Sequence, residues 1–345
     1  MPIRIDQLLT EAFQMKASDI HLTVGVPPVF RVHGDLKRYG ETPLTEEDTR
    51  EIAYQTIPEK VVPDFKEAGQ IDYSYEISDV SRFRVNAFQQ RGAISLAFRT
   101  IPTKIPTIDD LQMPETLKNL SGTAQGLILV TGPTGSGKST TLAAMIRYMN
   151  ETMRKHIITL EDPIEYMHDH GASIIDQREV GFDTLSFADG LRAALRQDPD
   201  VILVGEMRDL ETISTAITAA ETGHLVLATL HTWSAASTID RIIDVFPHGQ
   251  QAQIRVQLAG VLTAVISQRL FQTMDKDGRR AATEIMINNP AVSNLIRSEK
   301  VHQIPNVIQT NRALGMHMMD HSVKSLMEQG IISYEVAIPY LQGDD

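Results

Sequence analysis

The stretch that decides the fold reads Gly132-Pro133-Thr134-Gly135-Ser136-Gly137-Lys138-Ser139. An apolar run, residues 127–130, precedes it, and a helix-like segment follows from Thr140. In this setting the pattern is a P-loop, because its glycines allow a tight turn whose backbone N–H groups converge on phosphates. The lysine adds a positive charge, and the serine hydroxyl can ligate Mg²⁺. Residues 132–140 therefore predict binding of ATP or GTP together with Mg²⁺.

Length and composition limit the class of protein. The chain has 345 residues, more than one hydrophobic core usually holds, so we expect two domains. Apolar residues make up 42% and charged residues 22%, which is typical of a globular protein. No apolar run approaches the roughly 18–20 residues that cross a bilayer, so we expect no direct membrane insertion.

Charge and cysteine content exclude further classes. The N-terminal residues lack the features of a secretory signal, which predicts a cytoplasmic location. The absence of cysteine excludes disulfides and all thiolate metal sites. The net charge is −12, and no cluster of five or more Lys and Arg provides the basic face that nucleic-acid backbones require. We therefore expect no nucleic-acid partner.

The chain is expected to divide near residue 100. Apolar residues at helical spacing from Ile5 to Phe13 predict one helix, and Thr45 is expected to begin another. Strands are predicted at 20–24, 28–33, 72–77, 82–89 and 93–99. They indicate an α+β domain over residues 1–100. The three prolines of residues 101–114 indicate a linker.

Residues 115–345 are expected to form an α/β domain. Strands are predicted at 126–131, 156–161, 199–204 and 224–230, with helices near 138–150, 186–196 and 209–221. The last 80 residues are expected to be mostly helical, with one strand at 281–287. This alternation predicts an open α/β sheet with phosphate chemistry at the carboxyl ends of its strands.

Carboxylates follow two of these strands. One strand runs into Glu161-Asp162-Pro163-Ile164-Glu165, whose carboxylates could polarise the attacking water or hold Mg²⁺. A solvated acidic turn is the alternative. The apolar strand 201–204 leads to Glu206 at the Walker B position, where Asp is usual. Glu206 is one methylene longer, so we expect it to reach Mg²⁺ through water or to orient a water. Alternatively, it is an exposed acid at a strand end.

Two histidines flank the strand predicted at 224–230. His231 follows its carboxyl end, where ligands gather in open α/β sheets, and is a candidate sensor of the γ-phosphate. His224 precedes the strand and is a further candidate for nucleotide binding. A core or helix-capping role is the alternative for both histidines.

Taken together, these segments resemble the secretion ATPase superfamily of type II secretion and type IV pili. The segments that carry the resemblance are Ala17-Ser18-Asp19-Ile20-His21-Leu22, Gly132 to Ser139, Glu161 to Glu165, Val204-Gly205-Glu206-Met207-Arg208-Asp209 and Thr222 to Thr232. The resemblance spans nearly the whole chain. It implies a PAS-like N-terminal domain, a RecA-like P-loop ATPase domain with a helical C-terminal part, and a hexameric ring.

Within the superfamily, the chain resembles the branch that retracts pili. Residues 291–300 read AVSNLIRSEK and resemble the AIRNLIRE-type segment of that branch, although an ordinary amphipathic helix is the alternative. Assembly and secretion ATPases usually carry a long N-terminal extension and a four-cysteine zinc module. This chain has no cysteine and starts at the PAS-like domain. Pilus assembly or type II secretion remain alternative functions, followed by nucleic-acid translocation and ATP sensing without hydrolysis.

The resemblance also implies roles for single residues. Glu165 matches the catalytic glutamate that polarises water, and Glu206 completes the Mg²⁺ site with Ser139. Arginine fingers come from the segment that holds Arg82, Arg84 and Arg99, of which alternation places the first two on one face of a strand. Solvated surface charge is the alternative for these arginines, and Arg208 is a further candidate.

The implied mechanism is mechanical. ATP binding between the two domains closes them as rigid bodies, and hydrolysis releases the closure. Successive closures around the ring displace a partner, which for this family is the inner-membrane platform protein beneath the pilus. The resemblance thus places the chain at the inner face of the cytoplasmic membrane.

Overall fold

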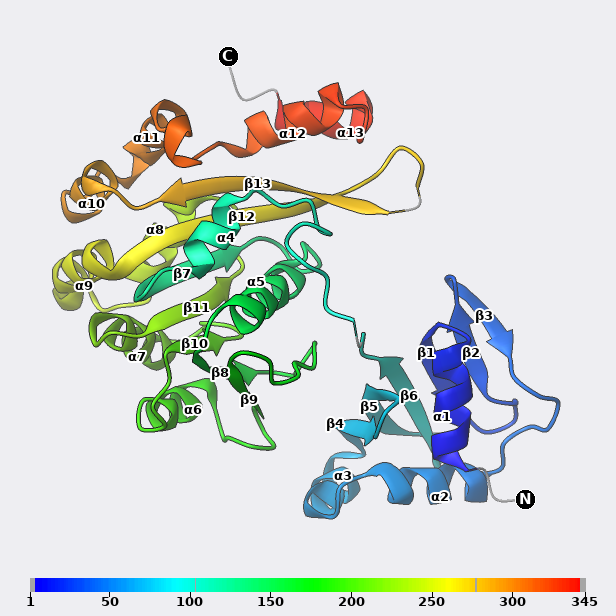
Figure 1. The fold of residues 1–345 in the computed structure, drawn as a ribbon. Coiled ribbons are helices and arrows are strands. Elements are labelled where there is room, and N and C mark those ends of the chain that lie inside the picture. The colour runs from blue at the N-terminus through cyan, green and yellow to red at the C-terminus, as the bar shows by residue number, and fades with distance from the viewer. Residues whose placement is uncertain (1–3, 103, 277, 342–345) are drawn as a thin grey trace. The chain divides into compact units, whose positions relative to one another are not determined.

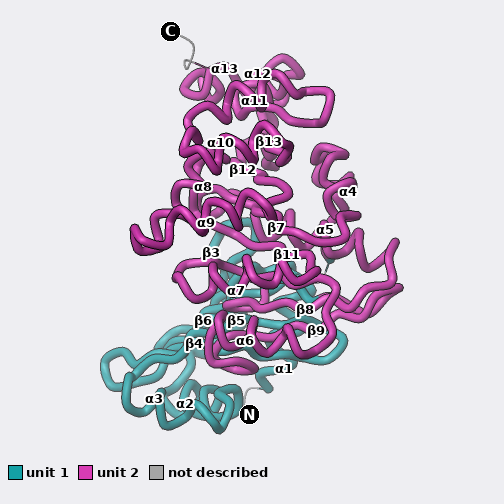
Figure 2. The backbone as a smooth tube through the Cα atoms, turned by 90° about the vertical axis from the view of Figure 1, so that its left-hand side faces the viewer, with its two compact units in different colours: residues 1–104, 165–167 teal, residues 105–164, 168–345 magenta. Residues whose placement is uncertain are grey.

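The computed structural model describes residues 4–102, 104–276 and 278–341. Contacts divide the chain into two compact units, which Figure 2 shows in different colours. The N-terminal unit holds Met1–Lys104 with Glu165–Met167, and the C-terminal unit holds Ile105–Ile164 with His168–Asp345. The boundary at Lys104 and Ile105 falls within the range predicted as a linker.

The N-terminal unit is a six-stranded antiparallel sheet with helices on one face (Figure 1). The strands follow the order β3-β2-β1-β6-β5-β4. The elements are α1 (Ile5–Gln14), β1 (Ala17–Leu22), β2 (Val29–Val32), β3 (Asp35–Arg38), α2 (Glu46–Thr56), α3 (Val62–Ala68), β4 (Gln70–Ile77), β5 (Ser81–Gln90) and β6 (Ala93–Thr100). All the helices and strands that the sequence predicts in this unit are present.

Local signals explain these elements well. Thr45 caps α2, because its side chain accepts the N–H of Asp48 while the Asp48 carboxylate accepts the N–H of Thr45. In β5, Phe83 and Val85 are buried, whereas Arg84 between them is exposed. This alternation is the period-2 pattern of a strand with one covered face.

The C-terminal unit is built on a seven-stranded sheet in the order β13-β12-β7-β11-β10-β8-β9. Neighbouring strands run parallel, except that β13 is antiparallel to β12. Its strands are β7 (Gly126–Thr131), β8 (His156–Glu161), β9 (Ile174–Glu179), β10 (Val201–Val204), β11 (Leu225–Leu230), β12 (Leu262–Gln272) and β13 (Arg279–Ile287). The α-helices are α4 (Thr116–Ser121), α5 (Lys138–Thr152), α6 (Phe187–Ala194), α7 (Leu210–Glu221), α8 (Ala235–Asp244), α9 (His248–Val261), α10 (Pro290–Arg297), α11 (Ile304–Thr310), α12 (Met319–Glu328) and α13 (Tyr334–Ala337).

Helices cover both faces of this sheet. Leu127 and Leu129 of β7 pack in one apolar cluster with α6 to α10, while Ile128 and Val130 pack in another with α4 and α5. All residues of β7, β10 and β11 are buried. Strands buried on both faces are typical of parallel sheets, and their carboxyl ends share one edge.

The structure differs from the sequence analysis at three places in this unit. Residues 262–272, part of which fell within the region expected to be helical, form the strand β12, and β9 was not predicted at all. Both strands are stabilised by pairing with distant segments, which local periodicity does not reveal. The segment expected to be a linker is partly ordered on this unit, since Ile108 and Met113 are buried in the cluster that contains α5.

Candidate nucleotide-binding site

The P-loop connects β7 to α5 and takes its shape from glycine. Gly132 has a φ of 144°, and a Cβ built on it would lie 2.3 Å from the carbonyl oxygen of Gln268. Gly137 has a φ of 88° and forms the N-cap of α5. Only glycine adopts these angles without strain. The loop therefore delivers the N-terminus of α5, with its free N–H groups, to the carboxyl edge of the sheet.

Two side chains inside the loop have groups suited to phosphate. The Lys138 ammonium donates to the carbonyls of Gly132 at 2.9 Å and Pro133 at 3.1 Å, and the residue is only 9% exposed. The Ser136 hydroxyl is buried and has no hydrogen-bond partner among the described residues. A buried, unpaired hydroxyl costs free energy that a phosphate oxygen would recover.

Residues of strand β12 that the sequence analysis missed form hydrogen bonds to the P-loop and to the first turn of α5. The Gln268 side chain is 2% exposed; its amide donates to the Ser136 carbonyl at 2.7 Å, and its oxygen accepts the Thr141 hydroxyl at 2.8 Å. The Ser267 and Thr131 hydroxyls are 2.9 Å apart. The available signal was a polar pair, Ser267 and Gln268, inside an apolar run. It was not recognised because the region was expected to be helical.

Glu206 lies between Arg208 and His231 beyond the end of β10. Its carboxylate is 2.6 Å from the Arg208 guanidinium and 3.0 Å from Nε2 of His231. The pairing of β10 with β11 brings Glu206 and His231 together, because Val204 is opposite Ala228. Glu206 raises the pKa of Arg208. Three predicted site residues thus meet at the edge of the sheet that carries the P-loop.

The acidic segment after β8 does not act as one cluster. Glu161 accepts hydrogen bonds from the Thr159 hydroxyl at 2.6 Å and the Gln177 amide at 3.2 Å. Glu165 is exposed and belongs to Glu165–Met167, which the contacts assign to the N-terminal unit. The catalytic role of Glu165 therefore stays a prediction.

His224, the further candidate for nucleotide binding, lies at the edge of the sheet opposite the P-loop. His224 precedes β11 and is opposite the start of β7, where its carbonyl accepts the Gly126 N–H at 3.0 Å. Because β7 and β11 are parallel, His224 lies at the amino edge of the sheet, away from the P-loop. Its Nδ1 lies 2.9 Å from the Ala219 carbonyl, near the end of α7. The capping alternative fits this contact.

The arginines of the N-terminal unit share the sheet face that is opposite its helices. Arg84 of β5 pairs in register with Arg99 of β6, and Arg99 pairs with Asp19 of β1. Arg99 is 71% exposed and donates to Asp19 at 2.9 Å, while Arg84 is 3.9 Å from Asp72. Burial raises the pKa of Asp19, but the Arg99 and Ser18 hydrogen bonds and the Arg99 charge outweigh it, so that pKa is lowered.

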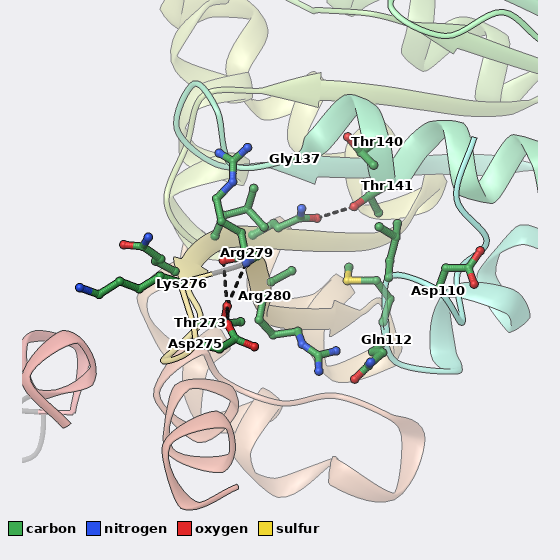
Figure 3. A pocket seen from close by; sticks show the side chains of 17 residues that line it. Asp110, Gln112, Gly137, Thr140, Thr141, Thr273, Asp275, Lys276, Arg279 and Arg280 are labelled. Atoms are coloured by element: carbon green, nitrogen blue, oxygen red, sulfur yellow. Dashed lines mark hydrogen bonds between the residues drawn. The ribbon is translucent and has the colours of Figure 1, made fainter. Parts of the chain in front are cut away.

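A cavity of about 990 Å³ adjoins the first turn of α5 (Figure 3). We call it the α5 pocket. Its wall includes Thr140 and Thr141 of α5, Leu270 of β12 and the arginines Arg279 and Arg280 of β13. The volume is at the upper end of the range for small-molecule sites, and the wall mixes apolar, polar and basic groups. Because it adjoins the phosphate-binding loop, this pocket can accept the nucleoside part of a nucleotide.

The described residues contain neither a preformed cluster of metal ligands nor a membrane-spanning helix. Among them, no group of three or more His, Cys, Asp and Glu side chains is arranged to hold a metal ion. No helix in the described ranges is both long and apolar enough to cross a membrane.

Comparison with known proteins identifies similar chains. A family model described as "Type II/IV secretion system protein" matches residues 1–329. The type IV pilus retraction ATPase PilT of Pseudomonas aeruginosa is 51% identical over 333 residues, which are 96% of this chain and 96% of that protein. A twitching motility protein of Neisseria gonorrhoeae is 51% identical over 310 residues, or 90% of this chain and 83% of that protein.

A solved structure agrees with the fold. The crystal structure of the pilus retraction motor PilT with bound ADP has a TM-score of 0.92 and 48% sequence identity, and it covers 99% of this chain and 98% of that chain. The predicted fold class, an antiparallel sheet domain followed by a mainly parallel α/β domain, is confirmed.

Proposed function

Because this chain belongs to the family of type II/IV secretion system proteins, we infer that it is a pilus retraction ATPase of the PilT type. It binds ATP at the P-loop and hydrolyses it, and the reaction drives the retraction of type IV pili that produces twitching motility. The observation that carries this inference is the P-loop itself, with Lys138 inside it and Gln268 behind it, in a chain 48% identical to an ADP-bound motor.

The α5 pocket holds the base and ribose in this proposal. Nucleotide phosphates then lie over the N-terminus of α5, where the helix dipole and the Lys138 charge both favour anions. The Ser136 hydroxyl, which has no partner among the described residues, gains a phosphate oxygen as acceptor.

We propose that Mg²⁺ would be held by the phosphates and the Ser139 hydroxyl, with Glu206 reaching the ion through water or orienting a water. Mg²⁺ prefers oxygen ligands and usually keeps phosphates and several waters in its shell, so it needs only one or two side chains. The Ser139 hydroxyl can ligate the ion directly, and the Glu206 carboxylate can act through a bound water. The ion supplies charge neutralisation to the triphosphate.

Catalysis is proposed to use groups from both units of the chain. Glu165 polarises the attacking water, and His231 senses the γ-phosphate through its contact with Glu206. Arg82, Arg84 and Arg99 are arginine fingers from this subunit or a neighbouring one, a contribution that is worth ~10³–10⁵ in rate in other phosphoryl-transfer enzymes. Arg208 can also reach a phosphate, since it is mostly exposed.

The assembly proposed here is a homo-hexameric ring that is peripheral at the inner face of the cytoplasmic membrane. There it acts on the inner-membrane platform protein of the pilus. The ring rests on the resemblance to hexameric secretion ATPases, and in a ring an arginine finger can be supplied in trans by a neighbouring subunit.

Lys138→Ala in the full chain tests the site. We expect ATP turnover to fall to background, because the phosphate charge loses its partner inside the loop. Lys37→Ala, which changes an exposed lysine of β3, is the matched control and should retain activity. In cells that lack their own retraction ATPase, the unchanged protein should restore twitching and the Lys138 variant should not. Normal turnover in the Lys138 variant would remove the site assignment.

A further inference from the structure

A second cavity in the C-terminal unit contains no residue of the P-loop and neither Glu206 nor His231, although it shares Gln112, Arg280 and Ala281 with the α5 pocket. Its volume is about 450 Å³, which is within the range of small-molecule sites. Its wall is formed by residues 112–116, strand β13, the loop 312–317 and helix α12. We call it the α12 pocket.

The α12 pocket is basic, although the protein is acidic. Arg280 and Arg312 line it, and no Asp or Glu is among its lining residues, so the two guanidinium groups carry the positive charge of its wall. The whole chain carries a net charge of −12. Asp320 lines a smaller neighbouring hollow that also contains Arg312. Such a local excess of positive charge favours an anionic occupant.

The two guanidinium groups are available to a ligand. Within the described ranges, neither Arg280 nor Arg312 forms an ion pair or a side-chain hydrogen bond. The planar guanidinium presents paired N–H donors that match phosphate oxygens. Figure 3 shows Arg280 extending toward Gln112, and both residues line the α5 pocket as well as the α12 pocket.

Neutral hydrogen-bond donors complete the wall. Ser322 and Ser325 are one helical turn apart on α12, and their hydroxyl oxygens accept the Thr283 N–H at 3.1 Å and the Gln329 amide at 2.8 Å. Because these oxygens act as acceptors, each hydroxyl hydrogen can still be donated to a ligand. His317 lies 2.9 Å from the Thr283 hydroxyl, and burial lowers its pKa.

We propose that the α12 pocket binds a phosphate-bearing small molecule. Arg280 and Arg312 grip the phosphate through charge-assisted hydrogen bonds, and the Ser322 and Ser325 hydroxyls donate to its remaining oxygens. This site is separate from the P-loop, so it is a second phosphate site on the same unit. Binding there does not require ATP hydrolysis.

The test uses the full chain with Lys138→Ala, which removes phosphate binding at the P-loop. Isothermal titration calorimetry with inorganic pyrophosphate at low salt should then show one remaining site. Adding Arg312→Gln should weaken it at least about tenfold, the loss expected for one charge-assisted hydrogen bond. Arg312 is chosen because Arg280 also lines the α5 pocket.

Two further variants make the result decisive. Ser325→Glu places a negative charge on the wall and should also abolish binding, whereas Arg297→Gln, which changes an exposed arginine of α10, should leave it intact. Circular dichroism verifies that each variant is folded. The proposal is overturned if pyrophosphate does not bind to the Lys138 variant, or if its affinity is the same in folded Arg312 and Ser325 variants.

Discussion

The buried side chain of Gln268 should control both the stability of the C-terminal unit and its affinity for nucleotide. Gln268→Leu keeps the approximate volume but removes the hydrogen bonds to the Ser136 carbonyl and the Thr141 hydroxyl. Each bond contributes about 1 kcal/mol, and a buried group left unpaired costs about 1–3 kcal/mol. Thr141 can turn to another acceptor, whereas the Ser136 carbonyl cannot. We therefore expect Gln268→Leu to lower the free energy of unfolding of the C-terminal unit by about 2–4 kcal/mol.

The affinity of Gln268→Leu for ADP should also fall, because the Gln268 side chain holds the backbone that presents N–H groups to the phosphates. Differential scanning calorimetry, with and without ADP, measures the unfolding of the C-terminal unit, and titration with ADP measures Kd. Thr141→Val removes only one of the two bonds and should have the smaller effect. Gln253→Leu, at an exposed position of α9, is the matched control. Wild-type stability and Kd in Gln268→Leu would refute the idea that β12 braces the loop.

Four shorter predictions address other residues. Glu165→Gln should retain ATP binding while ATP turnover falls by orders of magnitude. If binding and turnover assays show equal losses, Glu165 has a structural role and does not activate water. Arg84→Ala should lower ATP turnover in the assembled ring. An unchanged ATPase rate would mean that Arg84 is only a solvated surface charge. His224→Ala should leave the Kd for ADP unchanged, because His224 lies at the amino edge of the sheet; a large increase in Kd would contradict this position. Trp233, the single tryptophan, is 56% exposed and follows His231 by two residues, so its fluorescence should change on addition of nucleotide and stay constant in Lys138→Ala.

The P-loop could be predicted from sequence because all its requirements are local. The glycines at 132 and 137 supply positive φ values, and the flanking strand and helix are visible from their own residues. The role of Gln268 could not be predicted in this way. It is separated from its partner Thr141 by 127 residues, so it depends on a strand pairing that the local pattern does not contain.

The histidines show a different limit. His224 and His231 flank the same strand, and both were candidates for nucleotide binding. Strand direction alone separates them, because only the carboxyl end of β11 shares an edge with the P-loop. Chain order already shows that His224 precedes the strand and His231 follows it. The two histidines could therefore have been assigned to opposite edges of the sheet without a structure. The contact of Glu206 with Arg208 and His231 could not, since it needs the order of the strands in the sheet.

The candidate arginine fingers depend on charges that only the structure shows. Alternation correctly placed Arg82 and Arg84 on one face, but it did not reveal that Arg99 pairs with Asp19. If Arg99 moves to a phosphate, it must leave this partner. The cost is limited, since Arg99 is mostly exposed and Asp19, whose side chain is 17% exposed, keeps the hydrogen bond from the Ser18 hydroxyl. Arg84 is held still more loosely, at 3.9 Å from an exposed Asp72. The ion pairs of this face therefore orient the two arginines at little energetic cost, and a triphosphate, with several negative charges, is a stronger partner than either carboxylate.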